Sequence, residues 1–470
     1  MKLTKSDILA IPHHEAVGFD RLKKIKAVGV SIDSRTVKAD ELFIAIRGDQ
    51  FDGHNFISKT VETGVAAIIV ERRWAETNAA MIVSICIPRL IVENTVHAIG
   101  HLANIYRRKF DIPFIAVAGS NGKTTTKEMI KSVLNTKYHV LCTEGNLNNH
   151  IGVPQTLFRL EKKHEAAVIE IGTNHHGEIE YLCSILEPTH GLITNIGREH
   201  LEFFGSVEGV AKAEGELFDW LKKHRGTAFI NADDKYLELM AKKMKKTVSY
   251  GFSARGVSIK GTIKSFNEDA KALLHAKPRG KRAFDITVGI PGEHNAKNAL
   301  AAAAVGFTLK VPVTKIQNVI ASFQPASKRM QVQRATGVII LNDTYNANPD
   351  SMLAALATMQ TMKSNGKKIA VLADMLELGY NAEELHREIG KMLIQYSVST
   401  LFTFGSLSKF IYDAALVGTK AHFDDKAALT GFLLHTITDG DIVLVKGSRG
   451  MKMEEIVNAL VERLSQKAGT

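Results

Sequence analysis

The amino-acid sequence predicts an α/β protein built from three domains. Two observations support this prediction. The length of 470 residues suits about three domains of ordinary size, and short apolar runs alternate with helix-length segments through most of the chain. We expect a small N-terminal α/β domain at 1–92, a central domain with a mostly parallel sheet at 93–322, and a C-terminal doubly wound domain at 323–470.

The first two predicted domains meet near residue 93. Before it, residues 28–56 alternate apolar runs with turn residues, and 60–71 suggest a helix end leading into a strand. After it, residues 94–110 have helical spacing, and a strand is joined by a glycine-rich turn to a helix at 123–137. The strands predicted for the central sheet are 112–119, 139–143, 166–172, 190–197 and 227–234.

Residues 248–292 have a different pattern, with strand-like pieces and no helix between them. We expect an antiparallel extension there, followed by a helix at 295–309. Beyond Pro325 the alternation of strand and helix resumes, which predicts a Rossmann-like, doubly wound third domain. Its predicted strands are 337–343, 367–374, 399–405 and 441–447.

Composition excludes several classes of protein. Apolar residues make up 45% and charged residues 23%, as in ordinary soluble globular proteins. No apolar run reaches the ~20 residues of a membrane span, and the N-terminus lacks a secretion signal, so we expect a cytoplasmic protein. Its three cysteines are far apart and fit no disulfide framework or metal motif.

The net charge of +11 favours anionic partners. No aromatic residues interleave with the basic runs at 222–225, 242–246 and 277–282, so solvated surface is the simpler interpretation of these runs. A polyanionic small substrate explains the sign of the charge as well as nucleic acid does.

The strongest local motif is GSNGKTTT, Gly119 to Thr126, between an apolar strand and a helix. Glycines let backbone N–H groups face an anion, Lys123 can reach terminal phosphates, and Thr124 can coordinate Mg²⁺. Val117 stands where the strict phosphate-loop pattern has its first glycine, so an ordinary tight turn is the alternative.

Two polar residues follow neighbouring apolar runs. Glu170 lies in AAVIEIG, where a carboxylate needs a cation or hydrogen-bond donors, although it could instead cap its own turn with Thr173 or Asn174. His200 follows the next run, at the carboxyl end where ligands gather in open α/β sheets. A structural histidine is the alternative, because Mg²⁺ prefers oxygen ligands.

Two segments of the third domain join strands to polar turns. The first, LNDTYNANPDSM, has Pro349 and Asp350 at a predicted helix start, and it suggests ribose or base contacts or else a heavily capped loop. The second, VKGSRGMKME, places Lys446, Ser448 and Arg449 where an incoming carboxylate could be held.

Together these segments resemble the Mur ligases, the ATP-dependent amide-forming enzymes of peptidoglycan precursor synthesis. The resemblance covers nearly the whole chain and also includes DSR at 33–35, GNLNNHIGVP at 145–154, EIGTNHHGEI at 170–179, GEHNAKNALAA at 292–302 and ADMLELG at 373–379. Within the family, YNANPDSM and GTNHHGEI are similar to the members that add D-alanyl-D-alanine (D-Ala-D-Ala) to UDP-N-acetylmuramoyl-tripeptide (UDP-MurNAc-tripeptide).

The resemblance implies an acyl-phosphate mechanism with ATP and Mg²⁺, and closure of the third domain over the second to keep water away. It implies that the N-terminal domain binds the UDP-sugar, the central domain ATP, and the C-terminal domain the incoming dipeptide. The implied ATP-binding residues are Gly119, Ser120, Asn121, Gly122, Lys123, Thr124, Thr125, Asn295, Asn298, Arg329 and Asp343. The implied substrate-binding residues are Ser34, Arg35, Asn148, Asn149, Thr173, Asn174, Tyr345, Asn346, Asn348, Lys446, Ser448 and Arg449.

Glu214 marks one departure from the family pattern. Many relatives have a carbamylated lysine at this position in AKAEGELF, and glutamate supplies the same charge on a shorter side chain. Lys212 would point roughly 200° around a helix from Glu214 and is a poor substitute. The implied catalytic residues are Lys123, Glu170, His200 and Glu214, and the implied metal ligands are Thr124, Glu170, His200 and Glu214.

Two alternatives remain at this point. One is a sister ligase with another amino-acid substrate, or an enzyme similar to folylpolyglutamate synthetase. The other is a nucleotide-binding protein that no longer ligates. We expect small-molecule substrates, UDP-MurNAc-tripeptide and D-Ala-D-Ala, with no nucleic acid, no membrane span and a monomeric state.

Overall fold

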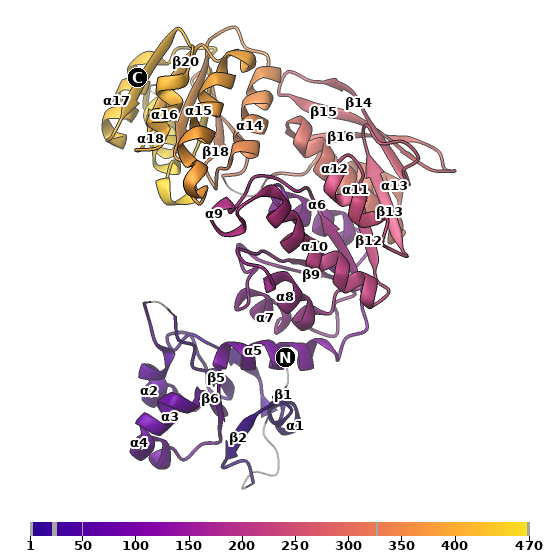
Figure 1. Ribbon diagram of the computed structural model, residues 1–470, viewed down its shortest axis with the longest axis vertical. Coiled ribbons are helices and arrows are strands. Elements are labelled where there is room, and N and C mark those ends of the chain that lie inside the picture. Colours follow the sequence, from indigo (N-terminus) through magenta and orange to yellow (C-terminus); the bar gives the residue numbers. More distant parts are fainter. Residues whose placement is uncertain (1–2, 21–25, 49, 326–327, 468–470) are drawn as a thin grey trace. The chain divides into compact units, whose positions relative to one another are not determined.

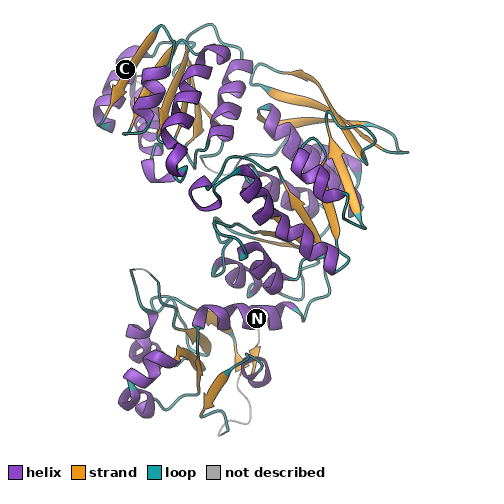
Figure 2. Cartoon of the chain, viewed as in Figure 1, coloured by secondary structure: helices purple, strands orange, loops and turns teal. Residues whose placement is uncertain are grey.

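The computed structural model describes residues 3–20, 26–48, 50–325 and 328–467. It separates into two compact units, one of residues 1–116, 138–173 and 177–190, the other of 117–137, 174–176 and 191–470. Mixed sheets with flanking helices recur along the chain, as an α/β class requires (Figure 2). No helix in the described ranges combines the length and apolarity needed to cross a membrane.

The N-terminal part of the first unit contains a five-stranded sheet of order β2-β7-β6-β5-β4, in which β2 is antiparallel and the others are parallel. Its apolar core packs strand side chains such as Phe43 and Ile68 against Trp74 and Ile82 of the helices. The strands are β1 (Leu3–Thr4), β2 (His14–Val17), β3 (Lys26–Ala27), β4 (Gly29–Ser31), β5 (Glu41–Ile44), β6 (Ala67–Glu71) and β7 (Arg89–Val92). The helices are α1 (Lys5–Leu9), α2 (Ile57–Glu62), α3 (Arg72–Thr77), α4 (Ala79–Ser84) and α5 (Thr95–Arg107).

A nine-stranded sheet of order β16-β15-β14-β13-β12-β11-β8-β10-β9 contributes strands to both units. Its strands are β8 (Phe114–Ala118), β9 (Val140–Cys142), β10 (Ala166–Glu170), β11 (His190–Ile193), β12 (Thr227–Asn231), β13 (Thr247–Gly251), β14 (Ile259–Phe266), β15 (Lys271–Pro278) and β16 (Phe284–Pro291). The helices of this region are α6 (Lys123–Asn135), α7 (Gly152–Leu157), α8 (Glu178–Leu186), α9 (Leu201–Phe204), α10 (Val207–Lys223), α11 (Lys235–Ala241), α12 (Glu293–Thr308) and α13 (Val313–Ala321). All five residues of β8 are buried, because a central strand of such a sheet is covered on both faces.

The predicted antiparallel extension is confirmed for β14, β15 and β16. It is wrong for residues 248–252, because β13 pairs parallel with β12 and with β14. The helix α11 between β12 and β13 provides the crossover that a parallel pair needs. The contact of β13 with β14 is brief, with Tyr250 opposite Ile259 and Gly251 opposite Lys260.

The C-terminal part, coloured orange to yellow in Figure 1, is doubly wound, as predicted. Its six-stranded sheet has the order β17-β18-β22-β19-β20-β21. Alternate residues of β18 point to opposite faces, so Leu341 packs with α14 and α15 and Ile340 packs with α17 and α18. The strands are β17 (Gln331–Ala335), β18 (Val338–Asp343), β19 (Lys368–Ala373), β20 (Thr400–Phe404), β21 (Thr419–Phe423) and β22 (Ile442–Lys446). The helices are α14 (Pro349–Thr361), α15 (Ala382–Met392), α16 (Ser408–Ala414), α17 (Lys426–Thr436) and α18 (Glu454–Lys467), with short 3₁₀ turns that include η2 (Gly379–Asn381) and η4 (Arg449–Met451).

Candidate active site

The glycine-rich turn lies between strand β8 and helix α6, as the sequence predicts. Gly119 has φ +112° and Gly122 has φ +80°, conformations that side chains rarely adopt. An added Cβ at Gly119 would lie 2.4 Å from Thr194 Oγ1. Gly122 is the N-cap of α6 and offers no capping side chain, so the helix N-terminus is open to an anion.

The loop Thr194–His200, named here the bracing loop, holds the glycine-rich turn from one side. The Ser120 N–H donates to the Asn195 carbonyl (2.9 Å), and the Asn121 N–H donates to Asn195 Oδ1 (3.1 Å). The Thr194 hydroxyl donates to the Asn121 carbonyl at 2.7 Å. These bonds to the bracing loop fix the conformation of the glycine-rich turn.

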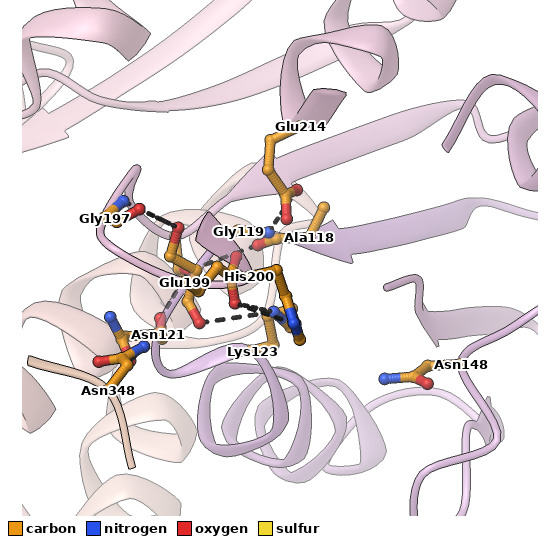
Figure 3. A network of polar contacts seen from close by, with 12 residues as sticks. Ala118, Gly119, Asn121, Lys123, Asn148, Gly197, Glu199, His200, Glu214 and Asn348 are labelled. Atoms are coloured by element: carbon orange, nitrogen blue, oxygen red, sulfur yellow. Dashed lines mark hydrogen bonds and ion pairs between the residues drawn. The ribbon is translucent and has the colours of Figure 1, made fainter. Parts of the chain in front are cut away.

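Two acidic side chains lie beside Lys123 and the glycine-rich turn. Lys123 Nζ lies 3.2 Å from Glu199 Oε2, and the Gly119 N–H donates to Glu214 Oε2 at 2.8 Å (Figure 3). Glu199 and Glu214 are 7% and 1% exposed. Burial, reinforced by the charge of Glu199 and opposed by that of Lys123, raises the pKa of Glu214 from 4.5 to about 8.

This donor set suits a hard divalent cation. Glu214 Oε1 is buried and has no hydrogen-bond partner among the described residues, and two buried carboxylates are the ligand type that Mg²⁺ prefers. A cation here would offset the cost of burying the charge of Glu214. Across the described residues, no three His, Cys, Asp or Glu side chains form a ready metal cluster.

His200 lies at the end of the bracing loop, where it is the N-cap of α9 with φ +47°. Its Nδ1 is 2.6 Å from Glu377 Oε2, and its Nε2 is 3.9 Å from Glu199 Oε2. The hydrogen bond from His200 lowers the pKa of Glu377. His200 therefore bridges two acidic side chains, one of them beside Lys123.

Glu170 belongs to the first unit, where it ends β10 and is 2% exposed. Its Oε1 accepts a hydrogen bond from Asn148 Nδ2 (2.9 Å), and its N–H donates to the Thr143 hydroxyl (3.0 Å). Asn149 accepts from the Gly152 N–H at the start of α7, a structural contact that the sequence did not indicate. Thr173 is buried, and its hydroxyl donates to Glu178 at 3.1 Å.

Ser34 and Arg35 also belong to the first unit. The Arg35 side chain is 83% exposed and pairs with Asp33 at 2.7 Å. The hydrogen bonds from Arg35 lower the pKa of Asp33 to about 2. The DSR segment therefore presents a locally neutralised pair at the surface.

The predicted base-binding asparagines lie against the glycine-rich turn. An added Cβ at Gly122 would meet Asn298 Oδ1 at 2.8 Å. Asn298 Nδ2 donates to Asn295 Oδ1 (3.1 Å), and Asn295 Nδ2 donates to the Pro291 carbonyl (2.7 Å). Both side chains are buried, so α12 brings a fixed pair of amides to the turn.

The third predicted domain contributes the segment 343–350. Asn348 Nδ2 donates to Asn121 Oδ1 at 3.0 Å, which joins this segment to the glycine-rich turn (Figure 3). The Tyr345 ring lies 3.6 Å below the Arg329 guanidinium and 5.4 Å from that of Arg449. Cation–π contacts of this kind order two cations on one ring.

Lys446 and Ser448 are more enclosed than a carboxylate-binding role suggests. Lys446 is 2% exposed and binds Asp343 Oδ2 (2.6 Å) and the Asn346 carbonyl (2.9 Å). The Ser448 hydroxyl accepts from the Leu376 N–H and donates to the Ala347 carbonyl. Arg449 is exposed. Their predicted role in binding the dipeptide stays a prediction.

Sequence reasoning missed the bracing loop. The sequence motifs did not indicate Glu199. Its position directly before His200, a candidate at the end of a strand, is the signal that could have indicated it. Thr194 and Asn195 belong to no sequence motif that indicates a chemical role. Their roles depend on where β11 ends relative to the glycine-rich turn.

Comparison with known proteins identifies the family of this chain. Three family models match successive parts of the chain: the Mur ligase family catalytic domain at 26–107, the Mur ligase middle domain at 117–306, and the Mur ligase glutamate ligase domain at 328–449. A UDP-N-acetylmuramoyl-tripeptide--D-alanyl-D-alanine ligase of Haemophilus influenzae is 34% identical over 99% of each chain. The chain belongs to the Mur ligase family.

Other Mur ligases are similar to this chain in sequence or structure over more than nine tenths of their length. A UDP-N-acetylmuramoyl-tripeptide--D-alanyl-D-alanine ligase from Bacillus subtilis is 35% identical over 92% of this chain and 93% of its own. The crystal structure of MurF from Acinetobacter baumannii has a TM-score of 0.88 at 28% identity, covering 98% of this chain and 99% of that one. MurF from Thermotoga maritima in complex with ADP has a TM-score of 0.82 at 27% identity, covering 94% and 99%. The predicted three-domain α/β fold and family are confirmed.

Proposed function

We propose that this Mur ligase adds D-alanyl-D-alanine to UDP-N-acetylmuramoyl-tripeptide with ATP, in peptidoglycan precursor synthesis. The observation that carries the proposal is the full-length similarity to ligases of that name at 34–35% identity. The glycine-rich turn with Lys123 supports the use of ATP, as does the ADP complex of the Thermotoga maritima relative. A sister ligase with another amino acid is disfavoured, because the full-length relatives cited above carry the dipeptide in their names.

The reaction needs ATP because a carboxylate has no good leaving group. An oxygen of the substrate carboxylate forms a bond to the γ-phosphorus of ATP, the bond from that phosphorus to the β–γ bridging oxygen breaks, and ADP leaves. The dipeptide amine then forms a bond to the acyl carbon, phosphate leaves, and the amine nitrogen loses a proton. Lys123 stabilises the phosphate charge, in exchange for its present contact with Glu199.

Magnesium would be held by the predicted ligands Thr124, Glu170, His200 and Glu214, with Glu199 as an additional neighbour. Bound Mg²⁺ supplies charge neutralisation for the phosphoryl oxygens. The contacts of His200 with Glu199 and Glu377 fix the position of its ring in this proposed site.

The remaining assignments follow the same proposal. Ser34, Arg35, Asn148, Asn149, Thr173 and Asn174 serve the UDP-sugar and peptide, and Tyr345, Asn346, Asn348 and Arg449 serve the dipeptide. The domain boundaries at 92/93 and 322/323, the monomeric state and the cytoplasmic location stay predictions.

Phosphate release and amide formation test the function directly. The wild-type protein should release phosphate and form amide only when UDP-MurNAc-tripeptide, D-Ala-D-Ala and ATP are all present. Lys123→Ala should lower amide formation by about 100-fold, because one charge at the transferring phosphoryl group is lost. Lys131→Ala, on the same helix and bonded to Glu128, is the control and should behave as wild type. Phosphate release that needs neither substrate would contradict the proposal and indicate a simple NTPase.

A further inference from the structure

Arg198 of the bracing loop is held by two carboxylates from helices of the C-terminal sheet. Its backbone N–H donates to Asp350 Oδ2 (2.7 Å), and its Nε donates to Asp350 Oδ1 (2.9 Å). Its Nη1 donates to both oxygens of Glu388, at 2.9 and 2.8 Å. Asp350 lies in the first turn of α14 and Glu388 lies on α15, so one guanidinium joins two helices to the loop.

The neighbours of Arg198 in the chain contact the glycine-rich turn. The Gly197 N–H donates to the Ser120 hydroxyl at 2.8 Å, and Glu199 pairs with Lys123 at 3.2 Å. A Cβ at Gly197 would lie 2.7 Å from Asp350 Oδ2, so the carboxylate approaches the loop backbone directly. The loop is therefore bonded to the ATP-binding turn on one side and to α14 and α15 on the other.

The character of this junction suits reversible contact. The side chains of Arg198, Asp350 and Glu388 are 22%, 36% and 37% exposed. Ion pairs that remain partly exposed are weakened by water and salt, so they contribute less than fully buried pairs do. Leu385 adds a partly buried apolar contact from α15 to the cluster around Leu201. A junction of this kind can open and close with a small change in free energy.

We propose that Arg198 is a positioning residue that couples dipeptide use to ATP use. By holding Asp350 and Glu388, it keeps α14 and the preceding Asn348 against the glycine-rich turn, so that the acyl phosphate meets the dipeptide amine before it meets water. This inference rests on the proposed ligase function. Arg198 acts on the use of the amine-bearing substrate, the dipeptide. ATP binding does not depend on Arg198.

Glu388→Gln tests the coupling, because Glu388 lies on α15 and has no contact with the glycine-rich turn among the described residues. The KM for D-Ala-D-Ala should rise about fivefold, the population change expected when one partly exposed ion pair is lost. The KM for ATP should change by less than about twofold. The ratio of ADP formed to amide formed should rise above one, because stranded acyl phosphate hydrolyses. Glu383→Gln is the matched control, an exposed glutamate on the same helix whose one ion-pair partner among the described residues is Arg387 of that helix.

Two further measurements separate the outcomes. Raised salt should increase the KM for D-Ala-D-Ala of wild type more than that of Glu388→Gln, because the pair is screened only where it exists. Arg198→Lys, which cannot hold both carboxylates as a planar fork does, should shift the ADP-to-amide ratio in the same direction and serves if Glu388→Gln fails to fold. A ratio that stays at one in the folded variants, or a shift equal to that of Glu383→Gln, would overturn the inference. Absence of amide formation by wild type would instead refute the proposed function.

Discussion

Replacing the buried Glu214 by glutamine should change how the stability of the metal-free protein depends on pH. Relative to wild type, the variant should gain stability as the pH rises. Burial raises the pKa of Glu214 from 4.5 to about 8. A carboxyl whose pKa is raised on folding stabilises the folded state fully below its unfolded pKa, and this contribution is lost as the pH rises toward the folded pKa. Wild type should therefore lose stability between about pH 4.5 and 8 on account of this group, and the glutamine variant should not.

The magnitude follows from linkage. Between pH 5 and 8 the unfolded carboxyl releases its proton and the folded one largely retains it, at about 1.4 kcal/mol per pH unit. The expected loss for wild type over this interval is about 3 kcal/mol. Glutamine has nearly the same shape and does not titrate, so any fixed cost of its amide beside Gly119 cancels between the two pH values.

Urea unfolding with a chelator at pH 5 and pH 8 measures the effect. The unfolding free energy of the variant minus that of wild type should be more positive at pH 8 than at pH 5. Added Mg²⁺ should lower this difference at pH 8 by stabilising ionised Glu214 in wild type. Asp219→Asn, an exposed carboxylate on the same helix α10, is the control and should show no such pH dependence. An equal gap at both pH values would refute the reasoning that burial of this carboxylate governs its charge.

Two more substitutions test the packing of the site. Lys446→Met should destabilise the fold by about 3 kcal/mol in urea, because Asp343 loses its buried cation. Lys391→Met, which breaks an exposed pair with Glu384, should cost less than about 1 kcal/mol, and equal losses would contradict the difference in burial. Gly119→Ala should weaken ADP binding measured by calorimetry at least about tenfold, since its Cβ would collide with Thr194. Gly205→Ala, with φ +72° and open space around its Cβ, should leave ADP affinity unchanged, and parallel losses in both variants would argue for general strain.

Much of the local structure was predictable because it depends on residues that are close in sequence. The turn from β8 into α6 follows from Gly119 and Gly122, which tolerate positive φ, and the start of α14 follows from Asn348 and Pro349 as cap and first helical residue. The exposed Lys212 and the buried Glu214 likewise lie on opposite sides of α10, as helical geometry requires.

The error at residues 248–252 shows where such reasoning ends. A strand's partners and their direction depend on the connection that follows it, and the apolar pattern of β13 is the same for parallel and antiparallel pairing. The enclosure of Lys446 is a similar case. Its cationic side chain at a strand end suggested ligand binding, and only the neighbouring strand β18, which brings Asp343 to it, accounts for its burial.

The α/β class, the glycine-rich turn with Lys123 and the membership of the Mur ligases could be inferred from the sequence, since each depends on short motifs and their order along the chain. The partners of Lys123 and Arg198, by contrast, come from distant parts of the chain. Glu199 reaches Lys123 across 76 residues, and Arg198 reaches Glu388 across 190. The physical reason is that a charge is stabilised by whatever folding brings within a few ångströms of it, and spacing along the chain does not specify that neighbour.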